Sequence, residues 1–293
     1  MEWQDFIIQF EQSLKKKRRS ISTCIAYVKD IKQLALYFES KKLFNPKSIS
    51  YLDLKAYIEF ITEQGQFSPK TISRKINSLR TFFKFLLSID CITNNPCLII
   101  KHPLVETSVP RTLTISEYRA VRDCARTNRK IYTMIELLLQ TGIRIGELSR
   151  LKRHDFYKDK EGKYFLHIMS FSTIPTREVE LNPVIAICLH DYLKLVHNIE
   201  NNMRKYMFFT KTGRLVLIRN IRTAINRIFH KAGVTNATIN DLRNTFIIFQ
   251  LENGMRIEKV AELVGHKKTT TTQRYMQYVT NSNKKSTLKI TPL

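Results

Sequence analysis

Four short segments in the second half of the chain carry side chains that could act together on a phosphate ester. They are Thr141-Gly142-Ile143-Arg144-Ile145-Gly146-Glu147-Leu148, Asn240-Asp241-Leu242-Arg243, Leu263-Val264-Gly265-His266 and Thr271-Thr272-Gln273-Arg274-Tyr275. A guanidinium stays charged at neutral pH and binds phosphate oxygens through two parallel hydrogen bonds. Arg144 and Arg243 are therefore candidates for neutralising the charge on a phosphate. Stabilisation of this kind is usually the largest single contribution to catalysis.

Tyr275 could supply an attacking hydroxyl, and His266 lies nine residues before it. The unperturbed pKa of tyrosine is about 10, so Tyr275 needs a cationic pocket or a base to attack at neutral pH. His266 could donate a hydrogen bond to the phosphate or help to accept the tyrosine proton. Tyr278, three residues further on, is the alternative nucleophile.

Glu147 follows Arg144 by three residues and is predicted to orient either the helix that begins there or the guanidinium. A solvent-exposed glutamate on a surface helix is the alternative. Each segment taken alone fits a plain structural explanation, because surface arginines and packed histidines are common. The functional interpretation depends on finding all of them in one chain.

The charge of the chain indicates a polyanionic partner. Lys and Arg number 49 against 25 Asp and Glu, a formal charge of +24. The excess is +8 over residues 1–105 and +16 over residues 106–293, so it covers both halves instead of forming a basic tail. Such a field attracts nucleic acid first and an anionic membrane surface second.

Several other classes of protein are disfavoured. No apolar run approaches the ~18 residues that span a bilayer, and the acidic start of the chain is unlike a signal peptide. The five cysteines are scattered and contain no C-x-x-C pair. We therefore expect reduced thiols in a cytoplasmic protein and no metal site.

The elements that must position these residues are mostly helical, since 8 Gly and 8 Pro in 293 residues disfavour a turn-rich β fold. Apolar spacing predicts helices over residues 3–16, from a cap at Ser22 or Thr23 to about Phe38, and from about Ser50 to Glu63. Ser68-Pro69 opens a fourth helix. Residues 1–102 are thus predicted to form an all-helical domain.

One face of the fourth helix carries three cations, Lys70, Arg74 and Lys84, and no acid. We predict that this face contacts nucleic acid, with a solvated surface as the alternative. A second basic cluster precedes the second helix and is also predicted to bind DNA: Lys15, Lys16, Lys17, Arg18 and Arg19.

Residues 103–113 contain Pro103 and Pro110 and are predicted to be an interdomain linker. A second domain, residues 114–293, begins with the capping box Thr114-x-x-Glu117. Within it, residues 163–170 and 177–181 are predicted to form a hairpin, and residues 206–209 a short strand. The expected fold class is mainly α, with a small antiparallel β-sheet in a mostly helical second domain.

Together the motifs resemble the tyrosine recombinase, or lambda-integrase-like, family, which includes Xer-type recombinases and transposon integrases. The family pattern is T-G-x-R-x-x-E-L, H-x-L-R, L-G-H and a late Tyr, and the order and spacing match here. The similar positions in the first half are Ser22-Thr23, Tyr27, Asp30, Thr71 to Arg80 and Asn95-Pro96. The resemblance implies an N-terminal SAM-like core-binding domain and a C-terminal catalytic domain, and its spacing selects Tyr275 as the nucleophile.

Two positions depart from the family pattern. Asn240 replaces the His of H-x-L-R; it can donate an N–H to phosphate but cannot titrate near pH 7. The family places a Lys between the second and third strands as general acid, whereas residues 170–176 contain no Lys. Ser172 takes that place by its spacing from Arg177, and Lys211 is a weaker substitute. General acid catalysis typically contributes a factor of about 10²–10⁴, so loss of the acid is expected to slow DNA cleavage by up to that factor.

The resemblance implies a site-specific DNA recombinase that cleaves and rejoins DNA through a 3′-phosphotyrosyl intermediate, in integration, excision, inversion or resolution. It implies no cofactor, double-stranded DNA sites as partners and a homo-oligomer, from dimer to tetramer, on DNA, with room for accessory DNA-bending proteins. The end of the chain is expected to exchange onto a neighbouring protomer, and the expected location is the bacterial cytoplasm, on the nucleoid. The alternatives are a catalytically weakened or silent DNA-binding accessory protein of this fold and a type IB topoisomerase.

Overall fold

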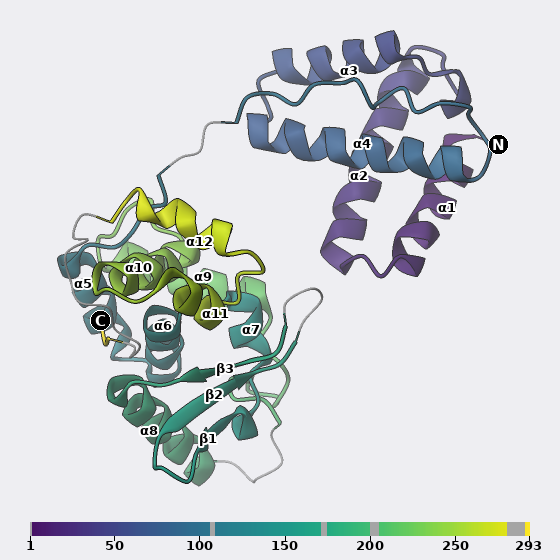
Figure 1. Cartoon of the computed structure of the whole chain (residues 1–293). Helices are drawn as coiled ribbons and strands as arrows, with labels where there is room; N and C mark the ends of the chain where they lie inside the picture. The colour runs from purple at the N-terminus through teal and green to yellow at the C-terminus, as the bar shows by residue number, and fades with distance from the viewer. Residues whose placement is uncertain (1, 106–108, 171–174, 200–204, 280–290) are drawn as a thin grey trace. The chain divides into compact units, whose positions relative to one another are not determined.

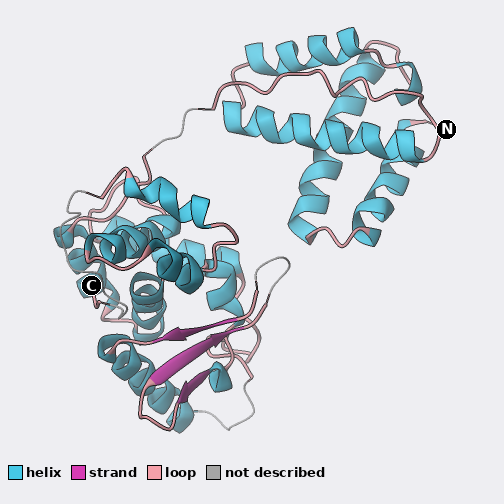
Figure 2. Cartoon of the chain, in the orientation of Figure 1, coloured by secondary structure: helices cyan, strands magenta, loops and turns pink. Residues whose placement is uncertain are grey.

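A computed structural model describes residues 2–105, 109–170, 175–199, 205–279 and 291–293. Within these ranges the chain has twelve α-helices and one three-stranded sheet, and the expected mainly helical class is confirmed (Figure 2). Two compact units, Met1–Thr107 and Ser108–Leu293, divide the chain. Their boundary lies inside the expected linker 103–113.

Four helices form the N-terminal unit (Figure 1): α1 (Trp3–Lys16), α2 (Ile21–Ser40), α3 (Tyr51–Glu63) and α4 (Pro69–Ser88). A capping box forms at Ser50, where the third helix was expected to begin: the Asp53 carboxylate accepts the Ser50 N–H at 2.8 Å. The cap expected for α2 at Ser22 or Thr23 is wrong. Ser20 caps this helix instead, since its Oγ accepts the Thr23 N–H at 3.1 Å.

A buried carboxylate joins α2 to α4 in this unit. Asp30, 2% exposed, accepts hydrogen bonds from Lys75 Nζ at 3.1 Å and Ser78 Oγ at 2.6 Å, and it forms a bidentate pair with Arg74. Lys75 is itself buried. Because a buried ammonium needs a counter-charge, this carboxylate fixes the register of the two helices.

Eight helices belong to the second unit. They are α5 (Ile115–Ala125), α6 (Arg129–Thr141), α7 (Ile145–Arg150), α8 (Pro183–Ile199), α9 (Ile218–Lys231), α10 (Ile239–Glu252), α11 (Ile257–Val264) and α12 (Thr269–Met276). Helix α6 packs against five others, α5 and α7 to α10, and lies among them in Figure 1. Every residue from Thr133 to Thr141 is buried. A helix that is buried on all sides in this way is the centre of a domain core.

The sheet has the order β1 (Phe156–Lys158), β2 (Tyr164–Ile168) and β3 (Arg177–Glu180), with antiparallel pairing throughout. The hairpin predicted over residues 163–181 is present, and β1 adds a strand that the sequence pattern did not indicate. The prediction of a strand over residues 206–209 is wrong. Only isolated β-bridges form there, in which Tyr206 pairs with Lys152 and Phe209 pairs with Leu215.

The last described residues lie against their own chain. Thr291 exchanges two hydrogen bonds with the Gln250 side chain, at 2.7 and 3.0 Å, and the Leu293 carbonyl accepts Arg122 Nη2 at 2.9 Å. Residues 280–290 lie outside the described ranges, so exchange of the tail between protomers stays a prediction. Among the described helices, none has the length and apolar character needed to cross a membrane.

The Asp30 cluster yields a stability prediction. Asp30→Asn removes the counter-charge of buried Lys75 and should lower the free energy of unfolding of the N-terminal unit by about 3–5 kcal/mol. Trp3, the only tryptophan of the chain, is buried in that unit, so its fluorescence in a denaturant titration follows this unit alone. Asp90→Asn is the matched control, because Asp90 is exposed. Equal unfolding midpoints for the two variants would contradict the prediction.

Candidate active site

Three backbone carbonyls at the C-terminal end of α11 bind three arginine side chains. Arg177 Nε donates to the Leu263 carbonyl at 2.7 Å, and Arg243 Nη2 donates to the Val264 carbonyl at 2.8 Å. Arg144 donates to the Val264 carbonyl at 3.0 Å and to the Gly265 carbonyl at 2.9 Å. The last carbonyls of a helix have no partner within the helix and carry partial negative charge. They are therefore suited to holding several cations close together.

Gly265 gives this helix end its shape. Its φ of +67° is left-handed, and the N–H groups of Gly265 and His266 bond back to the carbonyls of Glu262 and Ala261 at 3.0 and 2.8 Å. These two bonds form a Schellman motif. A Cβ at this position would lie 2.8 Å from Arg177 Nη1 and 3.2 Å from Arg144 Nη1. Both the backbone conformation and the close guanidinium groups therefore require glycine.

The turn between α6 and α7 brings Arg144 to the same place. Gly142 ends α6 in a left-handed conformation, with φ +60°, and Arg144 is the N-cap of α7. Arg243 Nη1, from α10, donates to the Gly142 carbonyl. The two arginines predicted from separate motifs thus meet, and the structure links them through this turn.

Glu147 is the counter-ion of the cluster, with 7% of its surface exposed. Its two oxygens accept Arg177 Nη1 and Nη2 at 2.8 and 2.9 Å, and Oε2 also accepts the Arg144 N–H at 2.8 Å. Burial alone would raise the pKa of Glu147, but the bonds and charge of Arg177, followed by those of Arg144, more than offset burial and lower the pKa. The carboxylate therefore stays ionised and orients both guanidinium groups; the exposed alternative does not hold.

Arg243 is buried among like charges. Burial, together with the charge of Arg144, lowers the pKa of Arg243 to about 9. At neutral pH this side chain is still protonated. With three guanidinium groups and one carboxylate, the cluster keeps an excess of positive charge that an anion could neutralise.

His266 lies next to these cations and is uncharged. Its Nδ1 is 2.8 Å from the Thr272 hydroxyl on α12. Burial, and then the charges of Arg243, Arg144 and Arg177, lower the pKa of His266 to about 4. A neutral imidazole that accepts the hydroxyl proton on Nδ1 carries its own proton on Nε2 and can donate it in a hydrogen bond.

Tyr275 lies on α12 beside His266, with ring centroids 6.3 Å apart. Its hydroxyl donates to Asn244 Oδ1 at 3.0 Å. Burial raises the pKa of Tyr275, and the charges of Arg243 and Arg144 offset part of that rise. Tyr278 follows the end of α12, and its N–H bonds to the Tyr275 carbonyl at 3.0 Å.

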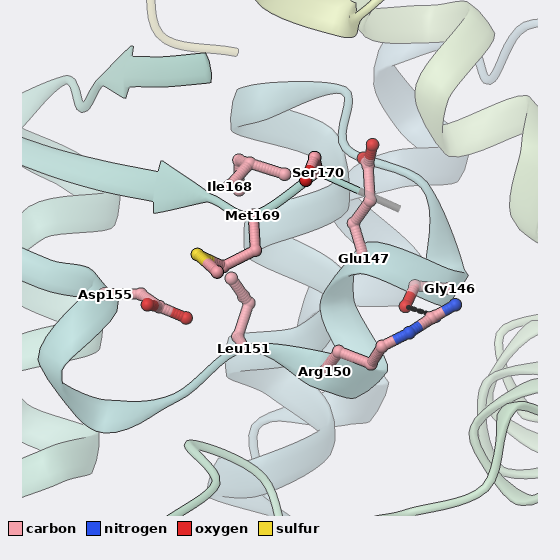
Figure 3. Close-up of a pocket in the computed structure, with 8 residues that line it drawn as sticks. All are labelled: Gly146, Glu147, Arg150, Leu151, Asp155, Ile168, Met169 and Ser170. Atoms are coloured by element: carbon pink, nitrogen blue, oxygen red, sulfur yellow. Dashed lines mark hydrogen bonds between the residues drawn. The ribbon is translucent and has the colours of Figure 1, made fainter. Parts of the chain in front are cut away.

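Two of the remaining predicted residues are exposed, and a third lies outside the residues that the structure describes. Asn240, at the start of α10, is exposed, and Lys211 is exposed in the turn after Phe209. Ser172 lies outside the described residues. The chain on either side of it does reach the site: Ser170 lines a small cavity beside Glu147 (Figure 3), and Arg177 pairs with that carboxylate.

The sequence matches the phage integrase family over residues 106–281, and the N-terminal SAM-like domain of phage integrases over residues 7–88. The chain belongs to the phage integrase family. The resemblance to the tyrosine recombinase family is confirmed, and so is the expected enzyme class, a tyrosine-type site-specific recombinase.

Known relatives of this integrase include two tyrosine recombinases named XerC. The protein from Staphylococcus carnosus is 29% identical over 258 residues, covering 86% of this chain and 85% of the relative. The protein from Listeria monocytogenes serotype 4b is 27% identical over 289 residues, covering 95% and 94%.

Solved structures share the fold at low sequence identity. A lambda integrase dimer bound to a COC′ core site has a TM-score of 0.73 at 16% identity, covering 99% of this chain and 81% of that one. The XerH recombinase bound to its difH substrate has a TM-score of 0.71 at 17% identity, covering 92% and 81%.

In the N-terminal unit of the integrase, the predicted basic residues differ in their surroundings. Lys70 and Lys84 are exposed on α4, whereas Arg74 is bound to Asp30. The residues of the other cluster, Lys15, Lys16, Lys17, Arg18 and Arg19, are all exposed. A role in binding DNA stays a prediction for each of them, and for Arg74 it competes with a structural role.

Sequence reasoning missed three residues of the site: Arg177, Asn244 and Thr272. Arg177 had a usable signal. It alternates with Glu178 and Glu180 along β3, which places it on the buried face, and a buried arginine needs a partner. Asn244 and Thr272 carried no comparable signal, because polar residues are ordinary on helix surfaces.

The two guanidinium groups beside Gly265 yield a second prediction. Gly265→Ala should lower recombination activity by about 100-fold, because it displaces Arg144 and Arg177. Gly233→Ala is the control: Gly233 has a φ of +69°, but a Cβ added there would have no neighbouring atom within 4 Å. Both variants carry the left-handed strain of about 1–2 kcal/mol. If both lost activity equally, backbone strain alone would explain the result.

Proposed function

We propose that this integrase cleaves one strand of duplex DNA through Tyr275. The tyrosine oxygen attacks the phosphorus, the bond to the 5′-oxygen breaks, and a 3′-phosphotyrosyl link forms. The tyrosine loses a proton and the leaving 5′-oxygen gains one. A 5′-hydroxyl from a partner strand reverses the step. The bond energy stays in the protein–DNA link, so that rejoining needs no ATP.

The observation that carries this proposal is a tyrosine hydroxyl beside preorganised guanidinium groups. Arg144 and Arg243 are held by the same carbonyl of α11, that of Val264. Donors fixed before the reaction need no reorganisation when charge develops on the phosphate. We assign these two arginines to the non-bridging phosphate oxygens and Glu147 to their orientation.

His266 acts in this scheme as an uncharged hydrogen-bond donor. Its lowered pKa, about 4, makes it a weak base at neutral pH. Asn240 could add a second neutral donor to the phosphate. Neither residue adds charge, so the arginines supply the electrostatic stabilisation.

Protonation of the leaving 5′-oxygen falls to the segment around Ser172 or to another nearby group. Two features support a role for this segment: the Ser170 N–H donates to Thr176 Oγ1 at 3.1 Å, and Arg177 pairs with Glu147. The described residues on either side of the segment are thus held together and paired with Glu147. A hydroxyl is a poor acid, so we expect departure of this oxygen to limit the rate.

Double-stranded DNA sites are the proposed partners, bound by a homo-oligomer of up to four protomers. The support is the similarity to a lambda integrase dimer bound to a COC′ core site and to a lambda integrase tetramer bound to a Holliday junction. The formal charge of +24 suits a DNA ligand. We also propose that accessory DNA-bending proteins take part and that the protein acts on the bacterial nucleoid.

Covalent capture tests the nucleophile. Tyr275→Phe should bind DNA normally and form no protein–DNA adduct, because it lacks the attacking oxygen. Tyr278→Phe, the matched control, should keep the adduct. Footprinting on DNA that flanks the gene supplies the site, and a nicked suicide substrate on a denaturing protein gel reports the adduct. An adduct formed by Tyr275→Phe would refute the assignment, and a wild type that binds without any adduct would indicate a silent accessory protein.

The salt dependence of binding tests the basic face of α4. A double variant, Lys70→Ala with Lys84→Ala, should weaken binding across DNA sequences and flatten the slope of log affinity against log salt by about 0.9 per lost phosphate contact. Arg74 is left intact because its loss would disturb the Asp30 cluster. Lys160→Ala with Lys163→Ala, on the loop between β1 and β2, controls for the loss of two charges. If both double variants changed the slope equally, net charge alone would explain binding.

A further inference from the structure

The Tyr275 hydroxyl donates to a side chain that none of the family motifs contains. Its acceptor is Asn244 Oδ1, 3.0 Å away. Asn244 follows Arg243 directly on α10 and is half-buried. The same turn of one helix thus supplies a phosphate-binding candidate and the hydrogen-bond partner of the nucleophile.

The amide of Asn244 has a fixed orientation. Its Nδ2 donates to the Arg111 carbonyl at 3.2 Å and lies 3.4 Å from Asp241 Oδ1. Asp241 is itself held by the backbone N–H and hydroxyl of Thr238, at 2.7 and 2.9 Å. Turning the amide over would place its oxygen against a carbonyl and a carboxylate. Asn244 therefore presents only its oxygen to Tyr275.

We propose that Asn244 is a positioning residue for the nucleophile, which holds the Tyr275 hydroxyl as a hydrogen-bond donor and keeps it protonated until attack. This inference rests on the proposed function of Tyr275. An amide oxygen does not accept a proton at neutral pH, so Asn244 cannot be the base. Because the O–H bond points at Asn244, the lone pairs of the hydroxyl oxygen point elsewhere and are available to a phosphorus atom.

The groups around Tyr275 pull its ionisation in opposite directions. Arg243 on α10 and Arg144 at the start of α7 favour the phenolate. His266, after α11, is neutral at pH 7. Asp241 lies on the far side of the Asn244 amide. The bond to Asn244 stabilises the neutral phenol, and so opposes the arginines until the proton leaves.

Titration of Tyr275 in DNA-free protein tests the idea. The pKa of Tyr275 can be followed by NMR in protein labelled at tyrosine Cζ, and the signal is assigned by its loss in Tyr275→Phe. Asn244→Ala removes the acceptor of the neutral form, so the pKa should fall. Asn244→Asp places a negative charge beside the hydroxyl, so the pKa should rise. Asn226→Ala, an exposed position on α9, should leave it unchanged.

Single-turnover cleavage gives a second measurement. At neutral pH, Asn244→Ala should cleave about three- to tenfold more slowly, the equivalent of one hydrogen bond, with unchanged affinity for DNA. An unchanged pKa of Tyr275 in both Asn244 variants would overturn the inference, as would a cleavage rate equal to that of the wild type. A shift in the same direction for both variants would point to general disturbance of the helix and would also overturn it. The titration needs no reaction, so it separates this inference from the assignment of Tyr275 as nucleophile.

Discussion

The attachment of three arginines to the C-terminal carbonyls of α11 is the interaction on which the site depends. Three guanidinium groups repel one another, and each also loses contact with water when it is buried. The helix end compensates with partly negative carbonyls that already lack partners, and Glu147 adds one full negative charge. The balance remains positive, so an anion completes the site electrostatically. A phosphate diester fits this requirement, because it presents one negative charge, shared by two non-bridging oxygens, to donors already in place.

Each arginine reaches this helix end from a different element. Arg144 comes from the start of α7, Arg177 from β3 and Arg243 from α10. The residues are up to 99 positions apart in the chain, so the cluster exists only after the whole second unit has folded. Its bonds join the sheet to the helices, and they stabilise both the fold and the candidate active site. Gly265 is also required for this cluster, because a side chain there would collide with the guanidinium groups.

The sequence was informative where chemistry dictates residue type. Two arginines, a histidine and a tyrosine in the right order sufficed to predict the centre of the site, and periodic apolar residues predicted most of the helices. Contacts between distant segments were harder to predict. The role of Arg177 depends on its contact with Glu147, thirty residues away in the chain, and the role of Asn244 depends on its contact with a tyrosine on another helix. Strand β1 has only three residues, too few for a pattern, and the cap of α2 was misplaced because three candidate hydroxyls lie within four residues.

On the proposed roles, the site separates charge stabilisation from proton transfer. It is rich in groups that stay charged and poor in groups that titrate near neutral pH: Asn240 cannot ionise, His266 stays neutral, and residues 170–176 contain no Lys. Binding and orientation of the phosphate are therefore provided for, while removal of the Tyr275 proton and protonation of the 5′-oxygen depend on weaker groups. The bond from Tyr275 to Asn244 accentuates this separation, because it favours the protonated nucleophile. The same bond holds the Tyr275 oxygen in place for attack, so loss of its proton must accompany attack on the phosphate, whose charge the arginines neutralise.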